Sequence, residues 1–232
     1  SAPPSFPAPS VQIAAGGNHS LALLADGTVK AWGANESWQT QVPAGLPPVA
    51  TLTAGRFHSV VITRVGAVIC WGDNRFGQCR VPAGLPPVTA VAAGFGHTVA
   101  LTQKGRVVCW GNNVDGQCAV PPDLSEVKAI AAGSSSTVAW LRDGRFVVWG
   151  AHGAELTHQL AALGPASLFA AGGSHVVLAR AATDLDHDGV DDFYEATHRA
   201  DPTRPDTDGD GLDDQSEILA GFDPARATET AD

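Results

Sequence analysis

The sequence of 232 residues lacks methionine and holds a single tyrosine, and its 14 lysines and arginines are outnumbered by 24 aspartates and glutamates. Because nucleic-acid binding depends on clustered Lys and Arg, this shortage of basic residues argues against a nucleic-acid partner. No apolar run approaches the ~20 residues that cross a bilayer, so we expect no membrane span. The start at Ser1 and four prolines among the next eight residues predict a trimmed terminus on a flexible, proline-rich leader, residues 1–10.

The negative charge is confined to the end of the chain. Residues 183–232 carry 16 acidic and 3 basic side chains, whereas residues 1–182 carry 8 acidic and 11 basic ones. A change of composition this abrupt marks a domain boundary. We therefore expect one domain over residues 11–180 and a second, acidic domain over residues 181–232.

One unit is repeated along residues 11–180. Four Trp-Gly pairs stand 39 residues apart, and a histidine recurs with the same spacing except where Ser136 replaces it. The pairs are Trp32-Gly33, Trp71-Gly72, Trp110-Gly111 and Trp149-Gly150. A fifth, incomplete unit over residues 166–180 stops before any Trp-Gly pair. The period predicts a stack of four and a half near-identical modules.

Each unit has the pattern of short β-strands. A small apolar run ends in glycine, a second run follows the histidine, and a glycine turn such as Asp26-Gly27 joins it to the Trp-Gly segment. Asp-Gly between two apolar runs favours a β-hairpin. Gly, Pro and β-branched residues throughout the unit argue against helical repeats of similar length. We predict an all-β, β-propeller-like array.

The recurring Ala-Ala-Gly-x-x-His-Ser, Trp-Gly-x-Asn-x-x-Gly-Gln and Val-Pro elements resemble the regulator of chromosome condensation repeat. They are most similar to its secreted bacterial branch, which includes propeller inhibitors of β-lactamases. The resemblance implies blades of a propeller, typically a ring of seven. Four and a half units are too few for such a ring in one chain, and the fourth unit departs from the pattern after Gly150.

Four cysteines form two pairs with the same spacing, Cys70 with Cys79 and Cys109 with Cys118. At the aligned positions of the other units both cysteines are absent, as a disulfide across the Trp-Gly loop would require. Zinc is the alternative, but two sulfurs without a consistently placed histidine make a poor tetrahedral site. Disulfides would place the protein in an oxidising compartment, and we predict a secreted, extracellular or cell-surface bacterial protein.

The acidic domain contains two copies of a calcium-loop pattern, 22 residues apart. In each, carboxylates fill loop positions 1, 3, 5, 9 and 12, glycine fills position 6, and an apolar residue at position 7 offers its carbonyl. The predicted ligands of the two Ca²⁺ sites are Asp184, Asp186, Asp188, Val190, Asp192 and Glu195, and Asp206, Asp208, Asp210, Leu212, Asp214 and Glu217.

Residues 183–226 resemble bacterial thrombospondin type 3 repeats, with dockerin-like half-hands as a related possibility. We expect a small calcium-binding domain with short helices, with calcium as the cofactor. An acidic disordered tail is the alternative, but random acidity does not place Gly and Glu at the required offsets twice. Because the carboxylates of each loop repel one another, we expect the region to order when Ca²⁺ binds.

The other conspicuous side chains favour packing or binding over catalysis. Histidines that recur in nearly every module belong to blade packing rather than to one active centre. Four aromatic residues in the loops between strands, Trp38, Phe57, Phe76 and Phe95, are candidate partner-binding residues. We find no nucleophile elbow, phosphate loop or catalytic carboxylate pair, and we predict that the protein is not an enzyme.

Three functions fit these features. The first is a secreted calcium-binding structural or adhesive protein that self-assembles into a closed oligomer or filament. The second is an extracellular protein-binding inhibitor, such as a β-lactamase-inhibitor-like propeller. The third is nucleotide exchange on a small GTPase, which the secreted chemistry and the shortage of repeats disfavour.

Overall fold

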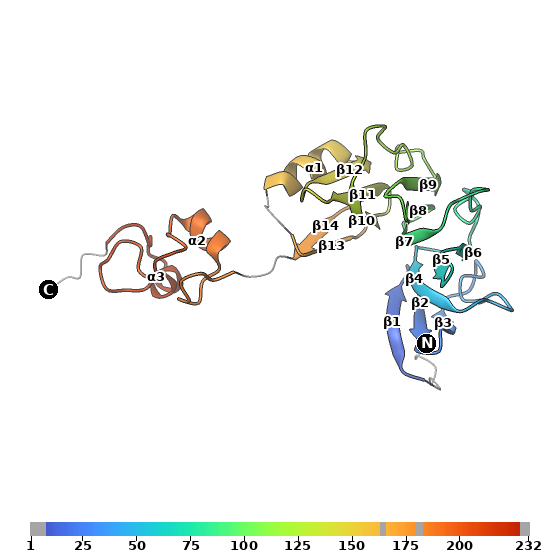
Figure 1. Cartoon of the computed structure of the whole chain (residues 1–232), viewed down its shortest axis with the longest axis horizontal. Coiled ribbons are helices and arrows are strands. Elements are labelled where there is room, and N and C mark those ends of the chain that lie inside the picture. The colour runs from blue at the N-terminus through green and yellow to red at the C-terminus, as the bar shows by residue number, and fades with distance from the viewer. Residues whose placement is uncertain (1–7, 163–165, 180–182, 228–232) are drawn as a thin grey trace. The chain divides into compact units, whose positions relative to one another are not determined.

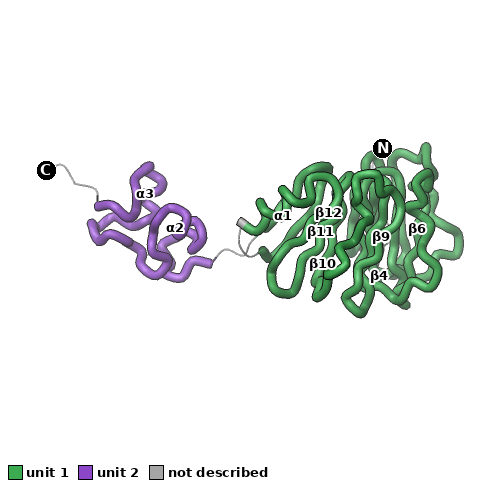
Figure 2. The backbone as a smooth tube through the Cα atoms, turned by 90° about the horizontal axis from the view of Figure 1, so that it is seen from above, with its two compact units in different colours: residues 1–179 green, residues 180–232 purple. Residues whose placement is uncertain are grey.

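The computed structural model describes residues 8–162, 166–179 and 183–227 (Figure 1). The chain divides into two compact units, residues 1–179 and residues 180–232, coloured green and purple in Figure 2. Most of the predicted leader, residues 1–7, lies outside the described residues. Among the described residues no helix is long and apolar enough to cross a membrane.

Unit 1 is a series of antiparallel sheets, one for each 39-residue repeat. The four full repeats each form a three-stranded sheet, and the incomplete fifth forms a two-stranded one. The sheets contain β1 (Ser10–Ala15), β2 (His19–Leu24) and β3 (Val29–Gly33); β4 (Val49–Ala54), β5 (His58–Thr63) and β6 (Val68–Gly72); β7 (Val88–Ala93), β8 (His97–Thr102) and β9 (Val107–Gly111); β10 (Val127–Ala132), β11 (Ser136–Leu141) and β12 (Phe146–Gly150); and β13 (Leu168–Ala171) and β14 (Val176–Ala179). The predicted all-β array of four and a half propeller-type units is confirmed.

The local signals of the repeat explain the strand ends. The hairpin glycines Gly27, Gly66, Gly105 and Gly144 all have positive φ, between 74° and 90°, which glycine adopts without a steric penalty. Near its start the first strand of each full sheet carries an irregularity of register against the second. The same 39-residue sequence pattern therefore forms the same three-stranded sheet four times.

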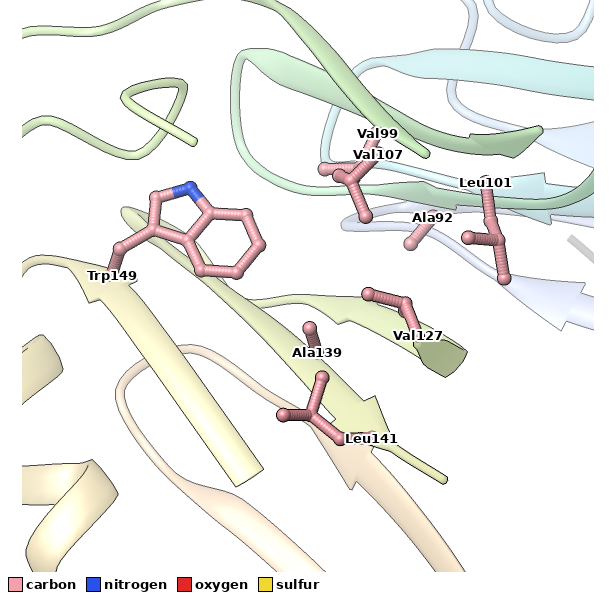
Figure 3. Close-up of a cluster of buried hydrophobic side chains, with 8 residues drawn as sticks. All are labelled: Ala92, Val99, Leu101, Val107, Val127, Ala139, Leu141 and Trp149. Carbon is pink, nitrogen blue, oxygen red and sulfur yellow. The ribbon is translucent and has the colours of Figure 1, made fainter. Parts of the chain in front are cut away.

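The core of unit 1 lies between successive sheets. Leu21 and Leu23 of the first sheet pack against Leu52 of the second, and Trp71 closes the same cluster. The cluster in Figure 3 is the corresponding junction of the third and fourth sheets. Its buried residues are Ala92, Val99, Leu101, Val107, Val127, Ala139, Leu141 and Trp149. Burial between neighbours is the stabilising term expected of a repeat array.

The first strands of the five sheets end around a common hollow of about 470 Å³. Its wall includes the glycine that follows each first strand, namely Gly16, Gly55, Gly94, Gly133 and Gly172. The first strands of the five sheets thus lie side by side around one axis, as the innermost strands of propeller blades do.

Helix α1 (Gly153–Ala162) is the feature of unit 1 that the sequence did not predict. It replaces the loop that follows Trp-Gly in the first three repeats, and its Leu160 is buried against the last sheets. The short helices predicted for the acidic domain are α2 (Asp192–His198) and α3 (Asp214–Ala220).

Candidate functional site

The first acidic loop of unit 2 folds around its own aspartates. Asp184 accepts a hydrogen bond from the backbone N–H of Gly189 at 3.1 Å, and Asp188 accepts one from Val190 at 2.7 Å. The second loop repeats both bonds 22 residues later, Gly211 to Asp206 at 3.0 Å and Leu212 to Asp210 at 2.9 Å. The glycine at position 6 of each loop has a φ near 98°, which permits the sharp bend.

These bends bring the aspartates of each loop together. Asp184, Asp186 and Asp188 offer carboxylate oxygens that all lie within 4.8 Å of one another. Asp206, Asp208 and Asp210 form the equivalent group in the second loop. Oxygens gathered in this way suit a hard cation such as Ca²⁺, which takes six to eight oxygen ligands.

The last carboxylate of each loop is buried, and no hydrogen-bond donor contacts it within the described part of the chain. The side chains of Glu195 in α2 and Glu217 in α3 are 0 % exposed, and both oxygens of each lack a partner among the described residues. Burial, together with the charges of neighbouring aspartates, raises the pKa of each glutamate to about 7. An unpaired buried carboxylate is costly unless a cation neutralises it. The residues present therefore fit calcium at both loops.

The aspartates at loop position 9 have a local structural role. Asp192 accepts a hydrogen bond from the backbone N–H of Leu185, and Asp214 accepts one from Thr207, both at 2.8 Å. Asp214 is also within 4.8 Å of Asp188 and Glu195 of the first loop. The sequence pattern assigned Asp214 to the second loop, because a loop pattern carries no information about contacts between loops.

The cysteines are joined as predicted, Cys70 to Cys79 and Cys109 to Cys118, with Cα–Cα separations of 5.0 Å. Each disulfide ties the loop after Trp-Gly to the third strand of its sheet. In the fourth sheet Thr157 of α1 stands at the aligned position, and its hydroxyl accepts a hydrogen bond from Val148 N at 2.9 Å. The same two positions are thus linked by a different bond.

The candidate aromatic residues all lie in loops at one end of the sheets, where the first strand ends and the third strand ends. Phe95 contacts Phe57 and Phe76, with ring centroids 6.0 and 6.5 Å apart. The guanidinium of Arg56 lies 5.3 Å from the ring centre of Phe57 and 5.0 Å from that of Phe95. Trp38 is 66 % exposed, with φ of 64° where the second and third repeats have glycine.

The recurring histidines link one sheet to the next. The Nε2 atoms of His19, His58 and His97 each lie 3.1 Å from a hydroxyl of the following sheet, on Ser59, Thr98 and Thr137. Those hydroxyls donate in turn to the carbonyls of Gln39, Gln78 and Gln117. Burial lowers the pKa of His58 and His97 to about 4, so both rings are neutral near pH 7. Their predicted role in blade packing fits this geometry.

The repeat of unit 1 matches a known type of repeat. Residues 11–38, 49–78 and 88–117 match the regulator of chromosome condensation (RCC1) repeat. The chain carries RCC1-type repeats. The fourth unit lies outside the matched segments, where Ser136 replaces histidine and α1 replaces the loop. No curated protein matches the chain.

Solved structures, yeast RCC1 among them, share the fold of the repeat region. Yeast RCC1 (Prp20), in its complex with Kap60, has a TM-score of 0.64 and 22 % identity over 75 % of this chain and 54 % of its own. The ectodomain of the receptor kinase CR4 from Physcomitrella patens has a TM-score of 0.60 and 24 % identity over 74 % of this chain. The ectodomain of ACR4 from Arabidopsis thaliana has a TM-score of 0.61 and 22 % identity over 76 % of this chain. The chain spans about half the length of these structures, 47 to 63 % of each.

Proposed function

We propose that this protein is a secreted calcium-binding structural or adhesive protein, in which RCC1-type repeats form a scaffold and the acidic unit binds two Ca²⁺ ions. The observation that carries the proposal is the pair of buried glutamates, Glu195 and Glu217, whose oxygens have no donor among the described residues and lie beside a group of aspartates. When bound, Ca²⁺ supplies the positive charge that compensates these carboxylates.

Calcium titration of the chelator-treated full-length chain tests the binding. We expect two Ca²⁺ ions per chain by calorimetry, together with protection of residues 183–227 from proteolysis, because the metal removes the repulsion among the carboxylates. Glu195→Gln and Glu217→Gln should each lose one ion, since an amide oxygen is neutral and cannot bind in a bidentate manner. Glu155→Gln, a change of an exposed glutamate in α1, is the matched control and should keep both. A wild-type chain that binds no Ca²⁺ at millimolar concentration would refute the proposal.

The secreted location is supported by the two disulfides, which persist in oxidising compartments. The structural role is supported by the scaffold itself, in which the conspicuous histidines are neutral and held in contacts between sheets. A repeat array of this kind exposes terminal faces to which a second copy can bind.

An extracellular inhibitor that binds another protein is the second candidate. It is favoured by the grouping of Arg56, Phe57, Phe76 and Phe95 at one end of the sheets, since aromatic and Arg side chains are the commonest binding anchors. The yeast RCC1 structure is a complex with Kap60, so a protein that shares this fold binds another protein. Exposed Trp38 lies in the corresponding loop of the first repeat.

A binding assay separates the two candidates. The immobilised chain would be exposed to purified extracellular hydrolases, β-lactamases included, with Phe76→Ala and Trp38→Gly as test variants. An inhibitor should bind one enzyme tightly and lose at least tenfold affinity on either substitution, in the range of ordinary interface anchors. Leu219→Ala, which removes an exposed apolar side chain of unit 2, is the control.

A further inference from the structure

The two acidic loops share carboxylates. The group of Asp184, Asp186 and Asp188 belongs to the first loop alone, but Asp188 is also within 4.8 Å of Glu195 and of Asp214. Asp214 begins α3 and is loop position 9 of the second loop. Asp214, a side chain of the second loop, therefore lies beside the carboxylates of the first loop.

Asp214 is positioned between the loops by contacts on both sides. Its two oxygens accept hydrogen bonds from Thr207, from the backbone N–H at 2.8 Å and from the hydroxyl at 2.7 Å. The neighbouring Gln215 donates from its side-chain amide to the carbonyl of Gly189 in the first loop at 3.2 Å. A carboxylate oxygen can accept more than one bond, so each oxygen of Asp214, which accepts one from Thr207, keeps acceptor capacity for a metal ion.

The equivalent residue of the first loop does not have this position. Asp192 also stands at loop position 9 and also accepts a bond from the N–H of loop position 2. Among residues 183–227, however, it belongs to none of the three carboxylate groups. The backbone role of position 9 is common to both loops, whereas of these two aspartates only Asp214 belongs to a carboxylate group with residues of the other loop, among residues 183–227.

A second, independent observation points to a ligand at this place. Glu195 is fully buried, neither of its oxygens has a hydrogen-bond partner among the described residues, and it lies in the same group as Asp214. Asp214 is itself 0 % exposed. Buried carboxylates this close repel one another strongly, and a divalent cation between them removes the repulsion.

We propose that Asp214 of the second loop is a ligand of the Ca²⁺ ion held by the first loop, so that the two loops form one coupled site pair. The inference rests on the proposed calcium binding and deepens it. Asp214 holds Thr207 of the second loop while it binds the ion of the first loop. Binding of Ca²⁺ to either loop therefore orders Asp214, which the other loop also uses. Binding should therefore be positively cooperative, and the coupling is reciprocal by thermodynamic linkage.

The test isolates one loop at a time in the full-length chain. Glu217→Gln removes the last ligand of the second loop, so calorimetry with Ca²⁺ then reports the first loop. Adding Asp214→Asn to this background should weaken the first loop by roughly tenfold or more, as expected for loss of a charged ligand. The amide keeps an acceptor for the N–H of Thr207, so the local fold of the second loop is disturbed little.

The matched control exchanges the loops. Glu195→Gln leaves Ca²⁺ binding to the second loop. In this background, Asp192→Asn should change the Ca²⁺ affinity of the second loop by less than twofold. An unchanged first-loop affinity in Glu217→Gln/Asp214→Asn, with one Ca²⁺ still bound, would overturn the shared ligand while leaving the proposed calcium binding intact. Absence of binding in the wild type would instead refute the proposed function.

Discussion

At the scale of single residues, the hydrogen bonds fix the protonation of the recurring histidines. The hydroxyl of Thr98 donates to the carbonyl of Gln78, so it can only accept from His58, whose Nε2 must carry the proton. The other ring nitrogen, Nδ1 of His58, is buried without a partner among the described residues. Protonating Nδ1 would create a buried donor and a charge in an apolar junction, which is why burial lowers the pKa.

This arrangement predicts that unit 1 loses stability in mild acid. The folded pKa of His58 and His97 is about 4, below the usual 6.5, so their contribution is fully present above pH 6.5 and is lost as the pH falls towards 4. The loss is on the order of 2–3 kcal/mol for each histidine by linkage. Urea unfolding at pH 7 and pH 5 measures it, and His58→Gln should reduce the pH dependence. His158→Gln, at an exposed position of α1, should leave the pH dependence unchanged; equal slopes in all three proteins would contradict the prediction.

At the scale of elements, the loop after Trp-Gly is fastened in two different ways. Disulfides hold it in the second and third repeats, and the hydroxyl of Thr157 bonded to Val148 holds α1 in the fourth. Closing a loop of nine residues restricts the unfolded chain by about 2–3 kcal/mol, more than the ~1 kcal/mol of a single hydrogen bond.

We therefore expect Cys70→Ala/Cys79→Ala to destabilise unit 1 by about 2–3 kcal/mol and Thr157→Val by about 1–2 kcal/mol, because the latter leaves a backbone N–H unpaired. Urea unfolding under non-reducing conditions measures both, and peptide mass spectrometry without reductant should show both disulfides. Thr40→Val, at the aligned, half-buried position of the first repeat, should change stability by less than about 0.5 kcal/mol, because no hydrogen bond of its hydroxyl is seen among the described residues. In protein isolated with a thiol-blocking reagent, cysteines that carry the reagent were free thiols, and finding them at these four positions would disprove the pairing.

The elements that the sequence predicted are those that its period repeats. Trp-Gly, the histidine and the hairpin glycine each occur four times, so each strand follows a pattern that is seen several times. Helix α1 occurs once, within a segment whose Gly153 and short length give little helical signal, and its position depends on burial of Leu160. The calcium-loop pattern likewise predicts the ligands of each loop, whereas the approach of Asp214 to Glu195 arises from packing of one loop on the other.

At the scale of the whole repeat array, the first and last sheets expose positions that are covered everywhere else. Ile13 of β1 is 74 % exposed, whereas Leu52, 39 residues later, is 3 % exposed in the junction of the first two sheets. Val177 of β14 is 56 % exposed, whereas its counterparts Val60, Val99 and Val138 are all 0 % exposed. The two exposed faces are the two sides of an internal junction. At each such junction, the face that carries Val60 or its counterpart packs against the face of the next sheet that carries the counterpart of Leu52.

Two such faces are complementary between copies, and we predict that the chain self-associates end to end. The Ile13 face of one copy would take the place of the next sheet on the Val177 face of another, giving a closed oligomer if the rotation closes and a filament if it does not. The added interface extends a packing mode that unit 1 already uses at each internal junction, and it covers strands that otherwise present apolar side chains to water.

Light scattering over a concentration series, with Ca²⁺ present, should show mass increasing beyond the monomer. Ile13→Asp and Val177→Asp should each suppress the increase, because either one buries a charge in the contact. Val65→Asp, at an exposed hairpin position where the first and fourth repeats have Asp26 and Asp143, is the matched control and should associate like the wild type. A compact monomer at every concentration would rule out the contact, and association that survives both face variants would assign it to another surface.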